Sequence, residues 1–396
     1  MRERCSSSMI MVAIAAATVI SVSIVTTSAQ GPVGSASTPA PAPKTPWGEP
    51  DLQGIWTDEF DTPLQRPAKY ATQEFFTEAQ RAELDKARSE ALGRLANERE
   101  LNSFYNAAAF FSTKRAGSRT SLIADPPNGR IPSLTPEAQK VAAAEREFRL
   151  ALLQATDTCK NKSAACAGGK YDATPSPRFA DRPPRYNTAN INRHDGPEDG
   201  TPANRCLTGG LPQFGGATGS FRRIVQTPGG ISIFYDVGQG QGWQRNIIMD
   251  GSPHLPANIR QWYGDSRGHW EGNTLVIDVT NFSPKTDYQG SRENLHLIER
   301  WTRIGANTLE YVVMIEEPTV WTRPWTVHEE FSKQSDAENR IYYEPRCVEG
   351  NYALPGWLRG RRMEELAFTQ GRGPDPATKD DTAPLIETEA LPDPLQ

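Results

Sequence analysis

Short runs of hydrophobic and polar residues typical of β-strands, separated by tight turns, fill most of the chain from residue 221 to residue 343. The first three runs are residues 221–226, 231–237 and 245–249, and the turn residues 228–230 separate the first two. In a strand, successive side chains lie on opposite faces. Further runs, paired around turns rich in Gly and Asn, cover residues 267–270, 274–279, 295–303, 308–315, 327–331 and 340–343. About six to nine closely spaced strands predict an antiparallel meander, closed or nearly closed into a barrel or lipocalin-like fold.

The pattern before residue 206 is helical and irregular instead. Residues 77–80 (TEAQ) form a capping box that opens a helix, and Thr135 followed by Pro136 opens a second helix. Residues 50–56 form a short strand-like entry. We therefore expect a mainly β chain with an N-terminal helical part (an α+β fold class). Its predicted parts are helices over 77–95 and 135–155, a helical and loop-rich region over 47–205, a β-barrel-like domain over 206–368 and a loose tail over 369–396.

The first 29 residues are typical of a secretory signal peptide. Arg2 and Arg4 give a positive start, residues 9–25 are almost all apolar or small, and Thr27 and Ala29 fit a small-residue cleavage site. A transmembrane anchor is the alternative, but the apolar stretch is long enough only if its Ser and Thr residues are counted generously. We predict cleavage after residue 29, a flexible linker over residues 30–46, a periplasmic or secreted location, and no stable membrane insertion.

Charge and cysteine content narrow the possible partners and the compartment. The formal net charge of −5 provides no basic field, which argues against a nucleic-acid partner. Without Cys5 of the signal segment, Cys159, Cys166, Cys206 and Cys347 remain, an even number that favours disulfides in an exported protein. Three connectivities are open, and we expect Cys159–Cys166 and Cys206–Cys347. A metal site is the alternative, but the chain has no Cys-x-x-Cys pair.

Several short motifs together resemble a large family of uncharacterised exported bacterial proteins. The motifs are PDLQGIW (residues 50–56), PHLP (253–256), GDSRGHWEGNTL (264–275), ENLH (293–296) and EGNY (349–352). The resemblance covers most of residues 47–365. It implies secretion and a β-rich fold, and it implies no particular reaction.

Candidate chemistry gathers in the longest of these motifs. His269 and Glu271 lie two residues apart in a predicted strand, so they project from the same face. A carboxylate beside an imidazole raises its basicity and fixes its tautomer, as a general base requires. Asp265 lies just before that strand, either as a ligand-binding residue or as the cap of a turn.

The predicted strand from residue 295 mixes polar and apolar residues on both faces. Glu299 shares one face with Trp301, and His296 shares the other with Arg300. A barrel lumen that holds a polar site among aromatic walls would produce this mixture, and so would an edge strand. The supply of large rings, including Tyr235, Trp262, Trp270 and Trp301, suits a cavity for an organic ligand, although each ring alone is more typical of core packing.

Motifs for cofactors and nucleophiles are missing from the sequence. There is no Gly-x-Ser-x-Gly elbow, and no Gly-x-Gly-x-x-Gly between a strand and a helix. A metal held by His254, His269 and His296 is a minor alternative, because the chain has neither His-Glu-x-x-His nor His-x-His. We therefore expect no cofactor.

Three hypotheses follow. The first is an exported enzyme that encloses a small, largely apolar or aromatic molecule and acts by cofactor-independent acid–base chemistry, as a lyase, isomerase or hydratase. In that hypothesis His269, oriented by Glu271, is the base, His254 or His296 is the acid, and Arg300 stabilises negative charge. The ligand would lie against the substrate-binding residues Tyr235, Trp262, Trp270, Trp301, Asp265 and Glu299. The second hypothesis is a lipocalin-like carrier without catalysis, and the third is a structural envelope protein.

Overall fold

The structure, a computed structural model, describes most of the chain after the N-terminal segment. The described residues are 43–97, 114–181, 194–199, 210–214, 221–238, 241–335 and 352–380. The predicted signal peptide and the predicted strand at 340–343 lie outside them. No helix in the described part is long and apolar enough to cross a membrane.

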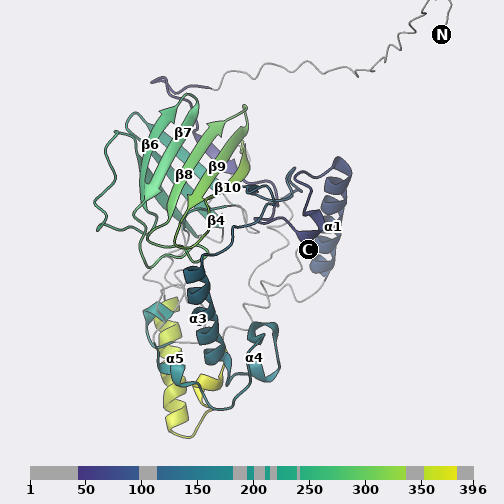
Figure 1. Cartoon of the computed structure of the whole chain (residues 1–396), viewed down its shortest axis with the longest axis vertical. Helices are drawn as coiled ribbons and strands as arrows, with labels where there is room; N and C mark the ends of the chain where they lie inside the picture. Colours follow the sequence, from purple (N-terminus) through teal and green to yellow (C-terminus); the bar gives the residue numbers. More distant parts are fainter. Residues whose placement is uncertain are drawn as a thin grey trace, which may run out of the picture. The chain divides into compact units, whose positions relative to one another are not determined.

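A closed barrel of nine strands forms the core of the described chain (Figure 1). Neighbouring strands are antiparallel with one exception, and β1 closes the barrel by pairing Trp56 with Lys333 of β10. A short further strand, β2 (Ile123–Asp125), extends the sheet beside β10. In order around the wall the barrel strands are β1 (Gly54–Thr57), β3 (Phe221–Thr227), β4 (Gly230–Gly238), β5 (Gln241–Ile248), β6 (Asp265–Glu271), β7 (Thr274–Thr280), β8 (His296–Arg303), β9 (Thr308–Glu316) and β10 (Trp325–Lys333).

The alternating pattern of the sequence sets which side chains fill the barrel. In β9 and β10 buried and half-buried positions alternate along nearly the whole strand. Trp301 of β8 lies opposite Tyr311 of β9, and both are buried. The predicted antiparallel, barrel-like fold is therefore confirmed. The barrel also includes β1, so its wall is not confined to the predicted domain at 206–368.

The wall has one seam where strand pairing is minimal. β5 and β6 run parallel, and Ile248 and Arg267 are their only pair of partner residues. A parallel pair needs a crossover connection, which here is the loop 249–264. Gly268 allows the strands to approach, because a Cβ there would lie 2.5 Å from Met249 Sδ and 2.7 Å from Ile247 Cγ2.

The predicted helices in the N-terminal half are confirmed. The capping box at the first helix forms, with Gln80 N donating to Thr77 Oγ1 at 3.2 Å and Thr77 N donating to Gln80 Oε1 at 2.9 Å. A C-terminal helix inside the predicted barrel domain was not expected. The helices are α1 (Glu78–Asn97), α3 (Pro136–Leu153), α4 (Asp157–Lys160) and α5 (Ala353–Thr369), with 3-10 turns η1 (Ala68–Tyr70), η3 (Ala164–Cys166), η4 (Pro177–Ala180), η5 (Pro197–Asp199) and η8 (Pro376–Thr378).

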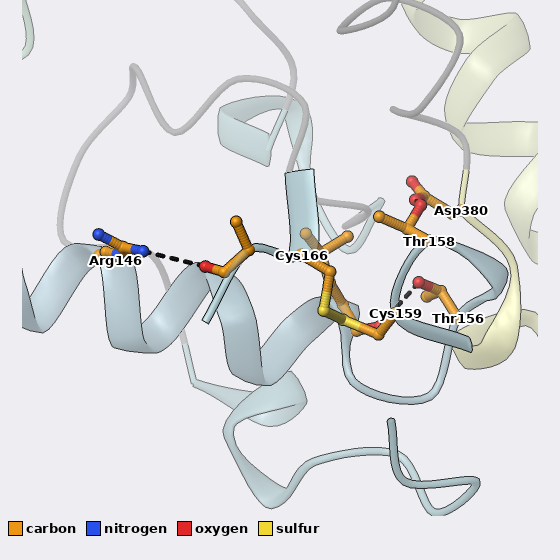
Figure 2. Close-up of a disulfide and its surroundings, with 8 residues drawn as sticks. Arg146, Thr156, Thr158, Cys159, Cys166 and Asp380 are labelled. Atoms are coloured by element: carbon orange, nitrogen blue, oxygen red, sulfur yellow. Dashed lines mark hydrogen bonds between the residues drawn. A yellow bond between two sulfur atoms is a disulfide. The ribbon is translucent and has the colours of Figure 1, made fainter. Parts of the chain in front are cut away.

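One predicted disulfide is present. Figure 2 shows the bond between Cys159 and Cys166, which links α4 to η3. Arg146 of α3 donates to the carbonyl of Ala167 beside it at 2.9 Å. A disulfide is consistent with an oxidising compartment. The second predicted pair, Cys206–Cys347, lies outside the described residues.

Candidate functional site

The barrel interior contains a buried ion pair among aromatic rings. Glu299 of β8 points inward from the same face as Leu297 and Trp301, and none of its surface is exposed. Arg245 points inward from β5, which is separated from β8 by two strands of the wall, and pairs with Glu299 through Nη2 and Oε2. A buried pair is tolerated only when further hydrogen bonds satisfy the remaining polar atoms.

Hydrogen bonds complete this pair on both sides. The Tyr311 hydroxyl donates to Glu299 Oε1 at 2.7 Å. Arg245 donates from Nε to Ser266 Oγ at 3.0 Å and from Nη1 to the Tyr235 hydroxyl at 3.3 Å. These five side chains therefore form a satisfied network across five strands, as a stable buried charge requires.

Burial and the neighbouring charges fix the protonation of the network. Burial raises the pKa of Tyr311 well above its usual value, and the charge of Glu299 adds to the effect. Burial also raises the pKa of Tyr235, although Arg245 opposes the shift. For Arg245 burial lowers the pKa, but the charge of Glu299, its hydrogen bond and the two tyrosines together outweigh burial and raise it. The phenols thus remain donors and the guanidinium remains charged.

A second arginine in the barrel has no carboxylate partner among the described residues. Arg222 of β3 is 0% exposed, and its Cζ lies 5.0 Å from the ring centroid of Tyr235 and 4.9 Å from that of Phe331. Its Nη2 donates to the Gln213 carbonyl at 2.8 Å. Within the part of the chain that the structure describes, its Nε and Nη1 have no hydrogen-bond partner. An uncompensated buried cation is costly, so these two N–H groups mark a position suited to an acceptor.

The segment 210–214 lies against this position. Leu211 is buried in the barrel core, and the ring of Phe214 lies 6.3 Å from Tyr288 and 6.5 Å from Tyr311. Because Gln213 supplies the carbonyl to Arg222, the segment presents an aromatic ring and an oxygen acceptor side by side to the barrel interior.

An indole N–H near Phe331 adds a second kind of donor. The ring of Trp301 lies 5.9 Å from the Phe331 ring, and its buried Nε1 has no partner among the described residues. Indole and guanidinium nitrogens are donors only. The unpaired N–H groups of Arg222 and Trp301 therefore all require acceptors.

Three stacked rings lead from this position toward the seam of the wall. Tyr235 and Trp243 stack at 4.2 Å with an interplanar angle of 5°, and Trp243 and Tyr263 stack at 3.9 Å with an angle of 18°. Tyr263 belongs to the loop 249–264, so the stack joins the lumen to the segment that crosses the seam.

The outer face of the wall holds a chain of alternating carboxylates and imidazoles. His254 Nδ1 lies 2.9 Å from Asp265 Oδ2, and His254 Nε2 lies 3.2 Å from Asp278 Oδ1. His296 Nε2 lies 3.0 Å from the same Asp278 oxygen, and His296 Nδ1 lies 3.3 Å from Glu316 Oε2. Two of the three predicted histidines therefore meet at one carboxylate, outside the barrel.

This series of carboxylates and imidazoles requires protons on its ring nitrogens. An ionised carboxylate only accepts hydrogen bonds, and a neutral imidazole donates from one nitrogen. His254 and His296 each face a carboxylate on both ring nitrogens, and for His296 the imidazolium form donates to both. The hydrogen bond that His296 donates to Asp278 raises the pKa of His296 and lowers the pKa of Asp278.

Asp265 anchors one end of the chain. Burial would raise its pKa, but hydrogen bonds from Arg267, the Leu255 N–H and His254 outweigh burial and lower it. Leu255 N donates to Asp265 Oδ2 at 2.9 Å, next to the contact with His254. Asp265 is therefore an ionised anchor for the loop 249–264, not a residue of the lumen.

His269 lies apart from the other two histidines. It projects outward from β6 with 59% of its side chain exposed, and its Nε2 lies 3.3 Å from Glu271 Oε1. Arg300 donates to the other Glu271 oxygen at 2.7 Å. The hydrogen bond from Arg300 lowers the pKa of Glu271, and the contact with His269 adds to the effect. The expected shared face of His269 and Glu271 is thus the solvent face.

The predicted site residues therefore do not form one enclosed site. The substrate-binding candidates Tyr235, Glu299 and Trp301 point into the lumen, Trp270 packs against its core, and Trp262 lies half-buried in the crossing loop. The polar candidates His254, Asp265, His269, Glu271, His296 and Arg300 lie on the outer side of the wall. Within the described ranges no group of three His, Cys, Asp or Glu side chains could hold a metal ion.

The residues that organise both groups, Arg222, Arg245 and Asp278, were not predicted from the sequence. Arg222 and Arg245 face inward. The sequence signal for this was their position on the same strand face as buried apolar residues. Asp278 was overlooked because it is a lone carboxylate in the apolar strand β7.

Two grooves of about 300 and 310 Å³ lie elsewhere, and neither contacts His254, His269 or His296. The first lies between α3 and the residues around 290 and 319. The second lies beside His328 and the residues around 60 and 118.

Comparisons with known proteins give little further information. No protein-family model and no curated protein matches the chain. A solved structure of a mutant of the fluorescent protein UnaG is similar over 32% of this chain and 79% of its own length, with 16% sequence identity and a TM-score of 0.21. At this TM-score the likeness supports no inference about this chain.

Proposed function

We propose that the barrel binds a small molecule that combines a planar aromatic part with an anionic oxygen group. Arg222 carries the proposal, because it is a fully buried guanidinium with two unpaired N–H groups among the described residues. Arg245 lies in the same lumen and pairs with Glu299, whereas Arg222 has no carboxylate partner in the part of the chain that the structure describes. A ligand carboxylate would pair with Arg222 in the bidentate geometry that guanidinium favours.

The chemistry of segment 210–214 supports the ligand class. Its Gln213 carbonyl and Phe214 ring already give Arg222 and Tyr311 an acceptor and an aromatic neighbour. The ligand takes the place of this segment, so its anionic group replaces the Gln213 carbonyl at Arg222. Its planar part replaces the Phe214 ring beside Tyr288 and Tyr311.

A matched pair of probes tests this proposal. Naphthalene-2-carboxylate and 2-naphthylmethanol share a ring system and differ in the anionic group. Calorimetry on the wild-type chain should show tighter binding of the carboxylate. Arg222→Met should weaken carboxylate binding by about 10- to 150-fold and leave alcohol binding nearly unchanged, since a hydrogen-bonded ion pair is lost.

Arg223→Met is the matched control, because Arg223 is adjacent on β3 and faces the other side of the wall. It makes the same change of net charge and should leave both affinities unchanged. Equal wild-type affinities for the two probes would contradict the proposal even if Arg222→Met failed to fold.

Turnover is not required for this function. The acid–base step expected from the sequence stays a separate prediction, since both ring nitrogens of His254 and His296 face carboxylates and Arg222 lies on the inner side of the wall. Deuterium incorporation into a bound probe in D₂O, measured by mass spectrometry, would identify such a step. A carrier returns the probe unlabelled.

A further inference from the structure

Tyr288 brings a buried hydroxyl to the Phe214 side of the barrel core. Its ring packs against that core, and the ring centroid lies 6.3 Å from that of Phe214. The hydroxyl oxygen is buried and has no hydrogen-bond partner among the described residues. Burial raises the pKa of Tyr288, so the hydroxyl keeps its proton and can donate it. A buried hydroxyl without a partner is costly, so this atom marks a position suited to a polar group of a ligand.

A tight turn fixes the position of Tyr288. Tyr288 N donates to the Ser291 carbonyl at 2.8 Å, and Ser291 N donates to the Tyr288 carbonyl at 2.9 Å. The two central residues, Gln289 and Gly290, have φ of 54° and 91°. Positive φ at both central positions is typical of a type I′ turn. Tyr288 therefore enters the core from a closed turn, and the turn holds it there without a ligand.

A second unpaired donor lies beside Tyr288. The Trp325 ring is fully buried and lies 6.3 Å from the Tyr288 ring, with an interplanar angle of 16°. Its Nε1 likewise has no partner in the described part of the chain. An indole N–H only donates, and a phenol can donate or accept, so an oxygen acceptor suits both groups.

The charged groups next to Tyr288 already pair with one another. Arg292 Nη2 donates to Asp287 Oδ2 at 3.1 Å and lies 3.9 Å from Glu145 Oε1. An ionised group of a ligand would therefore find this guanidinium already paired. A carbonyl or ether oxygen needs only a hydrogen bond, which makes an uncharged acceptor the better match.

The consecutive residues Gln213 and Phe214 connect this position with Arg222. The Gln213 carbonyl accepts from Arg222, and the Phe214 ring lies beside Tyr288. Only the N, Cα and Cβ atoms of Phe214 lie between that carbonyl carbon and the ring. In naphthalene-2-carboxylate a similar number of ring atoms separates the carboxylate from the second ring. A ligand that replaces the segment with its carboxylate at Arg222 therefore brings its far ring toward Tyr288.

We propose that the ligand of the lumen carries an uncharged oxygen acceptor on the end of its planar part away from the anionic group, and that the Tyr288 hydroxyl donates to this oxygen. This inference rests on the proposed function, and it narrows the ligand class to aryl carboxylates with a carbonyl or ether oxygen on the far ring. Arg222 then selects the charge of the ligand, and Tyr288 selects its second oxygen.

A second matched pair of probes tests this selection. 6-Acetylnaphthalene-2-carboxylate and 6-isopropenylnaphthalene-2-carboxylate have nearly the same shape, and a CH₂ group in the second replaces the carbonyl oxygen of the first. By calorimetry, the wild-type chain should bind the acetyl probe about three- to tenfold more tightly, because one buried hydrogen bond is gained. The same pair substituted at ring position 7 covers the other orientation of the ring. Tyr288→Phe should abolish the preference.

Tyr70→Phe is the matched control, because Tyr70 is a half-buried tyrosine that packs on Phe76 in a separate cluster. It should keep the wild-type preference. Without probe, Tyr288→Phe should not lower the denaturant midpoint, since its hydroxyl has no partner among the described residues. Infrared spectroscopy adds a direct signature, because the C=O stretch of the bound acetyl probe should lie at lower wavenumber in wild type than in Tyr288→Phe.

The outcomes separate the two proposals. Equal affinities for the acetyl and isopropenyl probes at both ring positions, or a preference that survives Tyr288→Phe, overturn the role of Tyr288. The proposed function stands in that case if naphthalene-2-carboxylate still binds more tightly than 2-naphthylmethanol. A lower midpoint for Tyr288→Phe without probe would show that the hydroxyl is already bonded within the chain, and it overturns the role as well. Absence of carboxylate binding overturns the proposed function, and with it the second acceptor.

Discussion

The inner and outer faces of the barrel wall each bring cations to carboxylates, and they differ in what surrounds those groups. Inside, Arg245 and Glu299 are shielded from water and bonded at nearly every polar atom. Outside, His254 and His296 meet a half-exposed Asp278. Charge buried in the lumen therefore fixes the structure at every physiological pH, whereas charge on the wall responds to protons.

The largest expected effect comes from breaking the inner pair. Glu299→Gln leaves Arg245 as an unbalanced buried cation, and we expect a loss of about 3–5 kcal/mol in the free energy of unfolding. Glu316→Gln removes a carboxylate from the outer face and should cost less than about 1 kcal/mol. Urea denaturation of both variants measures the difference, and equal losses would contradict the comparison.

The two lumen arginines should respond in opposite directions. Arg222→Met removes a cation that has no carboxylate partner among the described residues, so we expect about 1–4 kcal/mol of added stability. Arg245→Met leaves Glu299 as a buried carboxylate without its cation and should lower the free energy of unfolding. Thermal unfolding in the absence of probe distinguishes the two, and destabilisation by both variants would show that Arg222 is already balanced.

The seam should be sensitive to an added methyl group. Gly268→Ala places a Cβ against Met249 and Ile247, and we expect a loss of about 1–3 kcal/mol from overpacking. Gly305→Ala is the control, because its nearest neighbour would be Thr308 Oγ1 at 3.6 Å. A loss in denaturant midpoint for Gly268→Ala that is no larger than that of Gly305→Ala would argue for a loosely packed seam.

The smallest expected effect is a pH dependence of stability that comes from the carboxylates and imidazoles on the outer face of the wall. The pKa of His296 is raised on folding, so its contribution is complete below its ordinary value of 6.5 and is lost as the pH rises through the folded pKa. The pKa of Asp278 is lowered, so its contribution is complete above 3.8 and is lost as the pH falls through the folded pKa. NMR titration of the imidazole protons checks both shifts, and His296→Gln should remove the alkaline loss.

The barrel was predictable from local pattern, and the sites were not. Short β-type runs and Gly-rich turns predicted the strands from β3 to β10, because strands that follow one another in sequence tend to pair in space. The two faces of a strand left two possible orientations for Glu299 and His296, and the sequence did not say which of them is inside. The pairing of Trp56 with Lys333 closes the barrel, and no short-range sequence pattern predicts that these two residues meet.

The meeting of two histidines was beyond sequence reasoning for a related reason. His254 reaches Asp278 only because the loop 249–264 runs back along the wall to start a parallel strand. His269, by contrast, was chosen for its neighbour Glu271, and that contact is local and exposed. Local spacing therefore identified a real pair and missed the longer-range chain.

The closure of the barrel by β1 and β10 also constrains how the chain is assembled. Trp56 has no partner on that side until Lys333 has been synthesised, so a nascent chain exposes the unpaired edge of β1 for most of its production. Open edges template pairing with other chains. Such a chain depends on being shielded until its last strand arrives, and truncations before β10 should aggregate rather than fold.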